Sequence, residues 1–382
     1  MADRTPVIVG AVRTPLGKQD GLLRNIRPED LSIPLVENIM DDTGLDADQI
    51  DDLMWGCAQT REEQATNIAR QIAIFSLGEE VPGTTMDRQC ASSAQTIMSA
   101  ADAVAAGQRD AVFAGGVESM SRVKMGQGSG SMYPKMYERY GAENLPMGAT
   151  AEKVAEEWDV SKEDQDAFGA RSQQRAVEAT EEGRFDDEIV PLTGHDEDEN
   201  EVIVDKDEGL RPGTTAETIK DLPTVFKEDG TVTPATASQI SDGAAAVLVT
   251  SREFAEENGL NVLAEVGTHA VAGVDPTVMG IGPIPAVQKM MEGAGTSIED
   301  YGLVELNEAF ASQSIACQRE LGIDDDIINV NGGAIAIGHP LVCSGTRLPV
   351  TLIHEMNKRG VDRGISTQCV GFGQGGAIEF IV

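Results

Sequence analysis

Residues 34–44 read PLVENIMDDTG and residues 285–295 read PAVQKMMEGAG, so two stretches far apart in the chain share one pattern. Both place apolar residues at helical spacing and end in a glycine that suits the C-terminus of a helix. Each is followed by acidic residues and then by a short apolar run, residues 53–55 or 303–306, that predicts a strand. The sequence therefore predicts the same helix and strand twice in one chain.

A second pair of segments repeats in the same order. QCASSAQ around Cys90 aligns with VCSGTRL around Cys343, at almost the same offset as the first pair. Each cysteine precedes a helical stretch that ends at a glycine, Gly107 or Gly360, and a strand follows. Two separated segments that agree in order and spacing indicate a duplicated unit, and alternating strands and helices indicate a layered α/β domain.

The two predicted domains comprise residues 1–255 and 256–382. Residues from about 118 to 239 have no counterpart in the second half, and we interpret them as a loop domain inserted in the first half. Helices are predicted within this insertion at residues 150–158 and 162–182. Loops on a rigid scaffold are where substrate contacts concentrate.

Composition limits the class of protein. With 382 residues the chain is long enough for two domains. Its five cysteines form no CxxC pair, so neither a disulfide framework nor a zinc site is predicted. No apolar run approaches the length of a membrane-spanning helix, and the N-terminal stretch lacks the basic and apolar segments of a signal peptide. We therefore expect a cytoplasmic protein without a metal centre.

The net charge of -35 is the most unusual feature of the composition. It argues against binding to nucleic acid, which needs a basic surface, and against docking on an anionic membrane. The acidic residues form short clusters along the chain, such as HDEDENEVIVDKDE at residues 195–208. We interpret them as a surface adapted to high salt, as in a halophile, and keep a specific acidic interaction surface as the alternative.

The segment DRQCASSAQTIMS, residues 87–99, surrounds Cys90 with small or polar residues at the start of a predicted helix. The positive end of the helix macrodipole lowers the pKa of a thiol there, and small neighbours let a substrate approach closely. These properties are typical of a catalytic nucleophile. An inert, half-buried cysteine is the alternative.

His339 lies at the end of the glycine-rich stretch NGGAIAIGHP, residues 331–340, just before the helix that aligns with the Cys90 helix. Glycines permit tight turns and a close approach of the backbone. Taken alone, His339 is also compatible with a structural role. Its pseudo-symmetric placement opposite Cys90 favours a Cys–His arrangement in which the imidazole accepts the thiol proton.

Two further motifs carry candidate site residues. TQCVGFGQGG, residues 367–376, places Cys369 at the end of a strand, and the N–H groups of the following turn are suited to bind an oxyanion. VELNEAFA, residues 304–311, ends a strand with Asn307, whose amide is suited to hold a water or a carbonyl. The alternative for Asn307 is an N-cap of the helix that follows.

With these motifs in this order, the chain resembles the thiolase family of acyl-CoA acetyltransferases and ketothiolases. The resemblance covers essentially the whole chain, through PVIVGAVRTP, GGVESMSR, MGATAEKVA, ASQISDGAAA, GIGPIPA, NEAFA, GGAIAIGHP and CVGFGQGG. It implies a duplicated thiolase fold with five layers, α/β/α/β/α, a mixed sheet in each half and an inserted loop domain in the first half.

The resemblance also implies catalytic roles for five residues. Cys90 is the nucleophile that becomes acylated, and His339 lowers the pKa of Cys90 and accepts its proton. Cys369 is the acid or base at the α-carbon or the leaving thiol. Asn307 holds a water that, with His339, stabilises the enolate-like oxygen. The backbone N–H groups of Cys90 and Gly371 form a second oxyanion hole.

These roles imply ping-pong acyl transfer through an acyl-Cys90 intermediate. The reaction is the Claisen condensation of two acyl-CoA molecules, for example two acetyl-CoA to acetoacetyl-CoA and CoA, and its reverse, thiolysis. CoA is a substrate and product, and no metal or redox cofactor is implied. The alternative is a thiolase-like subunit that binds or channels acyl-CoA and acts only with a partner enzyme. The family habit implies a homodimer or a homotetramer.

The same resemblance assigns the CoA contacts. Arg211 in DEGLRPGTT would contact the nucleotide end, and Ser238 in TASQISDG would contact the pantetheine. Met147, in a loop beside Ser238, and Phe310 in NEAFA complete the predicted substrate-binding set. An ordinary surface ion pair is the alternative for Arg211.

Several positions depart from the family pattern. The departures are Asp87 before RQC, residues 92–94 after the cysteine, Pro146, Thr236, Val342 and Phe372. Val342 and Phe372 replace glycines, so we expect them to narrow the pocket or to re-aim its loops and thereby to affect the acyl-chain preference. The remaining cysteines, Cys57, Cys317 and Cys343, are interpreted as structural.

Overall fold

The computed structural model describes residues 3–126 and 132–382. Its main element is a ten-stranded sheet with the order β10-β11-β12-β9-β1-β8-β5-β3-β4, to which β2 adds by pairing with β8. The strands of the first half are β1 (Pro6–Arg13), β2 (Gly17–Lys18), β3 (Asp52–Gly56), β4 (Gly83–Met86), β5 (Ala111–Ser119) and β8 (Ser241–Ser251). Those of the second half are β9 (Ala264–Gly273), β10 (Leu303–Leu306), β11 (Arg363–Val370) and β12 (Gln374–Ile381).

The strand pairing repeats between the halves. β3 is parallel to β5, β5 is antiparallel to β8, and β8 is antiparallel to β1. In the same way β10 is parallel to β11, β11 is antiparallel to β12, and β12 is antiparallel to β9. Even β4, parallel to β3, has a counterpart in the single parallel bridge between Val304 and Ile328. The predicted duplication is confirmed.

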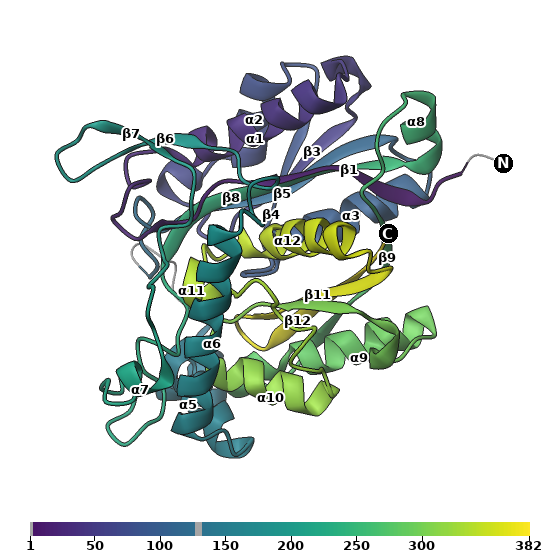
Figure 1. Ribbon diagram of the computed structural model, residues 1–382. Helices are drawn as coiled ribbons and strands as arrows, with labels where there is room; N and C mark the ends of the chain where they lie inside the picture. Colours follow the sequence, from purple (N-terminus) through teal and green to yellow (C-terminus); the bar gives the residue numbers. More distant parts are fainter. Residues whose placement is uncertain (1–2, 127–131) are drawn as a thin grey trace.

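One short contact joins the two halves into a continuous sheet. Val7 and Ile8 of β1 pair antiparallel with Glu265 and Ala264 of β9. The sheet bends around a central pair of helices, so each half forms its own sheet layer (Figure 1).

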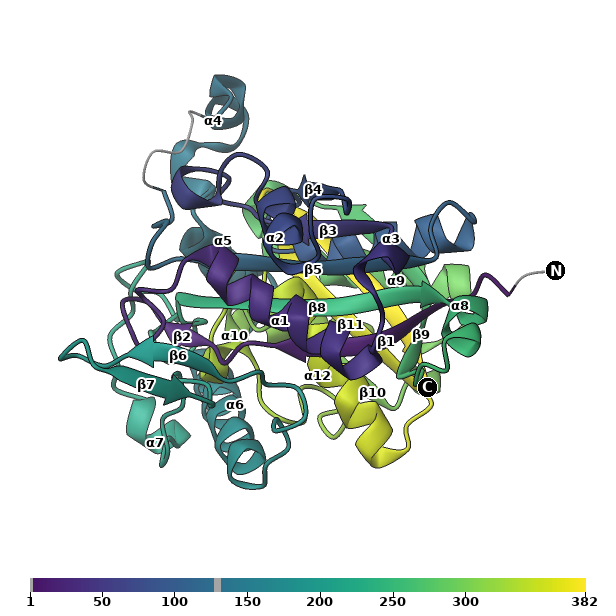
Figure 2. The ribbon, with the colours of Figure 1, turned by 90° about the horizontal axis from the view of Figure 1, so that it is seen from above.

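Helices complete five layers. α1 (Pro28–Thr43) and α2 (Ile68–Ser76) form one outer layer, and α9 (Pro283–Ala294) and α10 (Ala311–Leu321) form the other. α3 (Ser92–Ala105) and α12 (Ser344–Arg359) contact each other between the sheet layers. Seen from above, α1 lies across β5, β8 and β1 (Figure 2). This order of helix, sheet, helix, sheet, helix confirms the predicted layers, and separate apolar clusters fill the spaces between them.

The repeated helices end where the sequence predicts. α1 and α9 are capped by Gly44 and Gly295, whose φ angles of 66° and 69° are left-handed and therefore favour glycine. Gly107 and Gly360, after the two central helices, are left-handed as well. The start of α3 packs tightly on β3: a Cβ at Gly56 would lie 2.6 Å from the backbone nitrogen of Ser93.

The segment between β5 and β8 supplies most of the remaining elements. They are α4 (Pro134–Tyr140), α5 (Met147–Glu157), α6 (Lys162–Glu181), α7 (Ala216–Ile219) and the separate hairpin of β6 (Leu192–His195) and β7 (Glu201–Val204). α5 and α6 correspond to the two helices predicted in the insertion, and both contact α10 of the second half. α8 (Arg252–Glu257) and α11 (Ala334–Ile337) complete the helices, and the predicted boundary after residue 255 falls within α8.

Short 3-10 helices lie between several of the longer elements. The 3-10 helices are Ala47–Gln49, Glu62–Gln64, Ala142–Asn144, Pro276–Ile281 and Ile298–Asp300. The first and the last of these occupy equivalent places in the two repeats. Within residues 3–126 and 132–382, no helix combines the length and the apolar character needed to cross a membrane.

A buried ion-pair network anchors the inserted segment to β1. The Arg13 guanidinium donates to Glu188 at 2.6 Å and to both carboxylate oxygens of Asp207 at 2.7 and 3.0 Å, and all three side chains are fully buried. By contrast, Arg319 on α10 pairs with Asp164 on α6 at 2.8 Å on the surface.

We expect Arg13→Ala to lower the free energy of unfolding by about 3–5 kcal/mol, because two buried carboxylates lose their partner. Arg319→Ala, the matched control at the surface, should cost no more than about 1 kcal/mol. Urea denaturation of both variants measures the difference. Equal losses of the free energy of unfolding in the two variants would mean that burial does not strengthen the ion pairs that anchor this segment.

Candidate functional site

Cys90 lies at the junction between β4 and α3, at the wall of a cavity of about 670 Å³. The preceding residue, Gln89, has a left-handed φ of 47°, which is unusual for a residue with a side chain. Cys90 itself is only 6% exposed and packs against Leu341 and Val342 from the start of the α12 segment. The cavity wall thus contains residues from both halves of the duplicated fold.

The turn between β11 and β12 approaches the Cys90 sulfur. The backbone N–H groups of Gly371 and of Cys90 itself donate toward the thiol, and both contacts lower its pKa. Burial outweighs them and, with the nearby Glu118 and Asp87 carboxylates, raises the pKa of Cys90 to about 11. The prediction that the helix macrodipole yields a ready thiolate is therefore wrong for this protein, because the thiol is removed from water.

His339 is held by a hydrogen bond to Ser344, whose hydroxyl is itself bonded at the start of the α12 segment. Its Nδ1 lies 2.6 Å from Ser344 Oγ, and Ser344 Oγ donates to the Pro340 carbonyl at 3.2 Å. Because the single hydroxyl proton is used in that bond, His339 Nδ1 carries the ring proton and Nε2 keeps its lone pair. Burial and the Arg347 charge lower the pKa of His339 to about 3, so the ring is neutral at neutral pH.

Asn307 directly follows β10 and faces this ring. Its Nδ2 lies 3.3 Å from His339 Nε2, and its backbone N–H donates to the Thr367 carbonyl at 2.9 Å. The N-cap of α10 is Phe310, so the alternative interpretation of Asn307 as an N-cap is wrong. Among the residues that the structure describes, Asn307 Oδ1 is buried and has no hydrogen-bond partner, which leaves it able to bind a water.

Cys369 is the second thiol of the site. It is buried near the end of β11, and burial raises its pKa well above the usual value. A negative charge on Cys90 raises the pKa of Cys369 further, which shows that the two sulfurs interact electrostatically. Cys369 also packs against Met279, which lines the Cys90 cavity. The structure thus brings Cys90, Gly371 and Cys369 together, and Asn307 and His339 form a second pair at the start of the α12 segment, whose Leu341 packs against Cys90.

The residues predicted to contact CoA are spread over more of the fold than the predicted catalytic residues. Met147 begins α5 instead of lying in a loop, and it lines the Cys90 cavity. Phe310 packs against Cys369, and its ring makes an edge contact with Phe226 at 5.9 Å. The Ser238 N–H donates to the carbonyl of Ala309, at 3.0 Å, which places Ser238 beside Phe310.

Arg211 lies apart from the Cys90 cavity. Its backbone N–H donates to Gln173 at 2.9 Å, and it lines a separate small hollow with Ile219. Over the described part of the chain, its exposed side chain forms no ion pair within 4.0 Å, so the alternative of a surface ion pair is not seen. The guanidinium is free to bind another anion.

Three residues of the site escaped sequence reasoning. Ser344 fixes the His339 tautomer. Glu118 accepts from the N–H groups of Ala58 and Gln59, both at 3.2 Å, and so shapes the loop that lines the cavity. Glu308 accepts from Ser172 and from the Ile335 N–H, which ties the glycine-rich loop before His339 to α6. Each lies inside a motif quoted above, but nothing in the residue pattern distinguishes it from its neighbours there.

Burial of Glu118 raises its pKa to about 7, and the Glu118 charge raises the pKa of Cys90.

The other buried cysteines, Cys57, Cys317 and Cys343, form no disulfides. Val342, a departure from the family pattern, does not line the cavity; it fits over Gly56 and Gly116 beneath Cys90.

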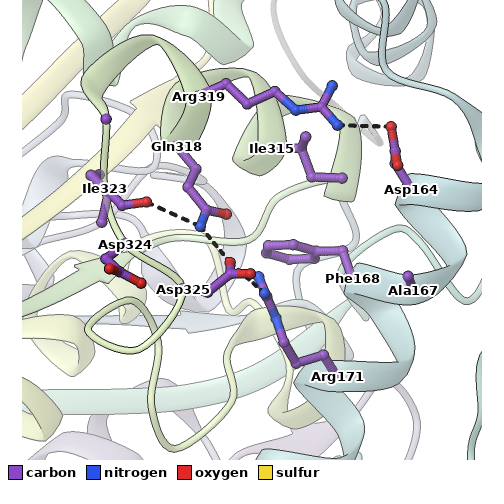
Figure 3. A pocket seen from close by; sticks show the side chains of 11 residues that line it. Asp164, Ala167, Phe168, Arg171, Ile315, Gln318, Arg319, Ile323, Asp324 and Asp325 are labelled. Atoms are coloured by element: carbon purple, nitrogen blue, oxygen red, sulfur yellow. Dashed lines mark hydrogen bonds and ion pairs between the residues drawn. The ribbon is translucent and has the colours of Figure 1, made fainter.

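A second hollow of similar volume, about 660 Å³, lies between α6 and α10 (Figure 3). Two ion pairs span it: Arg319 with Asp164 at 2.8 Å, and Arg171 with Asp325 at 2.5 Å. None of the predicted site residues lines it, and its cations are already paired. Across residues 3–126 and 132–382, no group of three or more histidine, cysteine or acidic side chains is placed to hold a metal.

Comparisons with known proteins agree with this geometry. The family model of the thiolase N-terminal domain matches residues 6–253, and that of the thiolase C-terminal domain matches residues 260–381. The chain belongs to the thiolase family. Both matches together span nearly all of it.

Named relatives and solved structures are similar over their full lengths. The chain is 46% identical to a 3-ketoacyl-CoA thiolase of Bacillus subtilis and 45% identical to one of Photobacterium profundum, with 98% of each chain covered. It superposes with a TM-score of 0.90 on the Bacillus anthracis acetyl-CoA acetyltransferase at 39% identity, covering 100% of this chain and 99% of the other. The human mitochondrial 3-ketoacyl-CoA thiolase gives the same TM-score and coverage at 35% identity.

The raised pKa of Cys90 leads to a pH prediction. Because the thiol is protonated at neutral pH, we expect its alkylation by iodoacetamide to speed up roughly tenfold per pH unit from about pH 7 to about pH 10. Intact-protein mass against time measures the rate, with Cys90→Ala as the control for the other cysteines. A rate that stays constant over this range would mean that Cys90 is already a thiolate.

Proposed function

We propose that this protein catalyses acyl transfer between CoA thioesters through an acyl-Cys90 intermediate, as thiolysis of 3-oxoacyl-CoA and as the reverse condensation. The observation that carries the proposal is the approach of the Gly371 N–H and the Cys369 thiol to Cys90, together with the Asn307–His339 pair, whose His339 closely precedes the Leu341 that packs against Cys90. A thiol nucleophile, a neutral base and oxyanion donors are the groups that this chemistry needs.

In the first half-reaction Cys90 Sγ attacks the thioester carbonyl carbon, and the thiol proton passes to His339 Nε2. The carbonyl oxygen becomes negative in front of the N–H groups of Gly371 and Cys90. The bond between carbon and the CoA sulfur then breaks, and His339 returns the proton to the leaving CoA thiolate. Neutral His339 with an unprotonated Nε2 suits this cycle, since it begins able to accept a proton.

In the condensing half-reaction the Cys369 thiol passes its proton to His339 Nε2, and the resulting thiolate removes a proton from the α-carbon of a second acyl-CoA. A water on Asn307 and the protonated Nε2 of His339 stabilise the enolate oxygen. The α-carbon attacks the acyl carbon on Cys90, the bond between that carbon and sulfur breaks, and His339 returns its proton to the Cys90 thiolate. In thiolysis the steps run backwards, and the high pKa of Cys369 suits it to protonate the departing carbon.

The binding contacts and assembly belong to the same proposal. Met147, Phe310 and Ser238 hold the pantetheine arm, and the unpaired Arg211 holds the nucleotide phosphates. No metal or redox group takes part. The edge strand β4 and the exposed Phe75 on α2, 74% exposed, support a homodimer or a homotetramer. A cytoplasmic location and adaptation of the acidic surface to high salt stay predictions.

A thiolysis assay tests this function. We expect the wild type to cleave acetoacetyl-CoA when CoA is added, and Cys90→Ala to be inactive because the nucleophile is lost. Cys369→Ala should lower kcat by a factor of about 10²–10⁴, which is the usual contribution of a general acid or base. The matched control, Cys343→Ala, replaces the repeat partner of Cys90, which lies outside the site.

Activity that survives Cys90→Ala would overturn the proposed nucleophile. Activity that appears only after a second polypeptide is added would favour the alternative, an acyl-CoA-binding subunit of a larger enzyme.

A further inference from the structure

Phe372 occupies an unfavourable backbone conformation beside the site. It lies between Gly371 and Gly373 in the turn from β11 to β12, and its φ of 64° is left-handed. A bulky side chain disfavours this region, which glycine enters freely. Strained residues of this kind concentrate at functional sites, where the side chain provides something that offsets the strain.

The side chain of Phe372 has little contact with the protein interior. It is 47% exposed, and it lines the same cavity as Cys90. Packing of the folded chain therefore does not explain why an aromatic ring stands at this position. Burial of the ring against a bound molecule would explain it.

The turn that carries Phe372 is fixed relative to the reacting atoms. The N–H of the preceding residue, Gly371, donates toward the Cys90 sulfur. On the other side, a Cβ at Gly373 would lie close to the backbone of Val274 and Pro276, so this part of the turn is tightly packed. The backbone of Phe372 is therefore held beside Cys90, and its side chain lines the cavity into which an acyl group on Cys90 would extend.

The cavity wall beside Phe372 is apolar: Leu145, Met279 and Leu341 line it there, whereas Gln59, Thr60, Arg61 and Gln89 add polar groups elsewhere. Its volume of about 670 Å³ takes up both the pantetheine arm beside Met147 and the acyl chain, and it exceeds what a two-carbon acyl group needs. Methionine side chains adapt to ligands of different shape. Each methylene that an acyl chain buries against such a wall strengthens binding roughly fourfold.

We propose that Phe372 is a specificity-determining residue that contacts the distal carbons of the acyl chain and so selects 3-oxoacyl-CoA substrates of medium chain length over acetoacetyl-CoA. The inference rests on the proposed thiolase function and adds the substrate class. Glycine at position 372 would relieve the backbone strain and remove the apolar contact with the acyl chain.

The test compares Phe372→Gly and Phe372→Leu with the wild type in thiolysis of acetoacetyl-CoA and 3-oxooctanoyl-CoA. The measured quantity is the ratio of kcat/KM for the longer substrate to that for the shorter one. Four extra carbons are involved, so we expect Phe372→Gly to lower the ratio at least tenfold. Phe372→Leu, which keeps an apolar side chain, should retain most of it.

Glycine fits a φ of 64°, so Phe372→Gly should fold, and its melting temperature should equal or exceed that of the wild type. A ratio within twofold of the wild-type value in the folded glycine variant would overturn the inference, and so would equal losses on both substrates. Failure of the wild type to cleave either substrate would instead refute the proposed function, so the two failures are distinguishable.

Discussion

The close packing of α3 against α12 is the constraint on which the site depends. A Cβ at Gly345 on α12 would lie 2.6 Å from the backbone nitrogen of Ala94 on α3, so the helices meet almost backbone to backbone. The Ser93 hydroxyl also donates to the Val342 carbonyl across this contact. Because Cys90 directly precedes α3 and the His339 segment precedes α12, the duplicated fold brings chemistry from its two halves together. A larger side chain at this contact would separate them.

The same packing determines the electrostatics of the site. It removes both thiols and the imidazole from water, which raises the pKa of Cys90 to about 11 and lowers that of His339 to about 3. The raised pKa of Cys90 and the lowered pKa of His339 favour the uncharged form of both groups at neutral pH. The buried Arg347, paired with Glu305 at 3.0 Å, favours this state because its charge opposes an imidazolium.

Much of this architecture could be predicted from the sequence, because repeats and helix-ending glycines are local signals. The small residues around Cys90 predict a site that a substrate can approach closely, and in the structure small residues at the start of α3 also meet α12 closely. The sequence could not predict that the pKa of Cys90 is raised, because this shift depends on burial of the thiol by residues from the second half. Nor could it show that Ser344 fixes the His339 tautomer, because a hydrogen bond of that kind depends on tertiary geometry. The separation of Arg211 from the cavity is equally a property of the folded chain.

The most direct test of the account is the intact mass of the protein after brief mixing with acetyl-CoA, for the wild type, Cys90→Ala and Cys369→Ala. Acyl loading requires Cys90, His339 and the N–H groups, but not Cys369. We therefore predict an acetyl adduct on the wild type and on Cys369→Ala, and none on Cys90→Ala. An adduct on Cys90→Ala, or none on the folded wild type, would contradict the assignment of Cys90 as the nucleophile at the junction of the two halves.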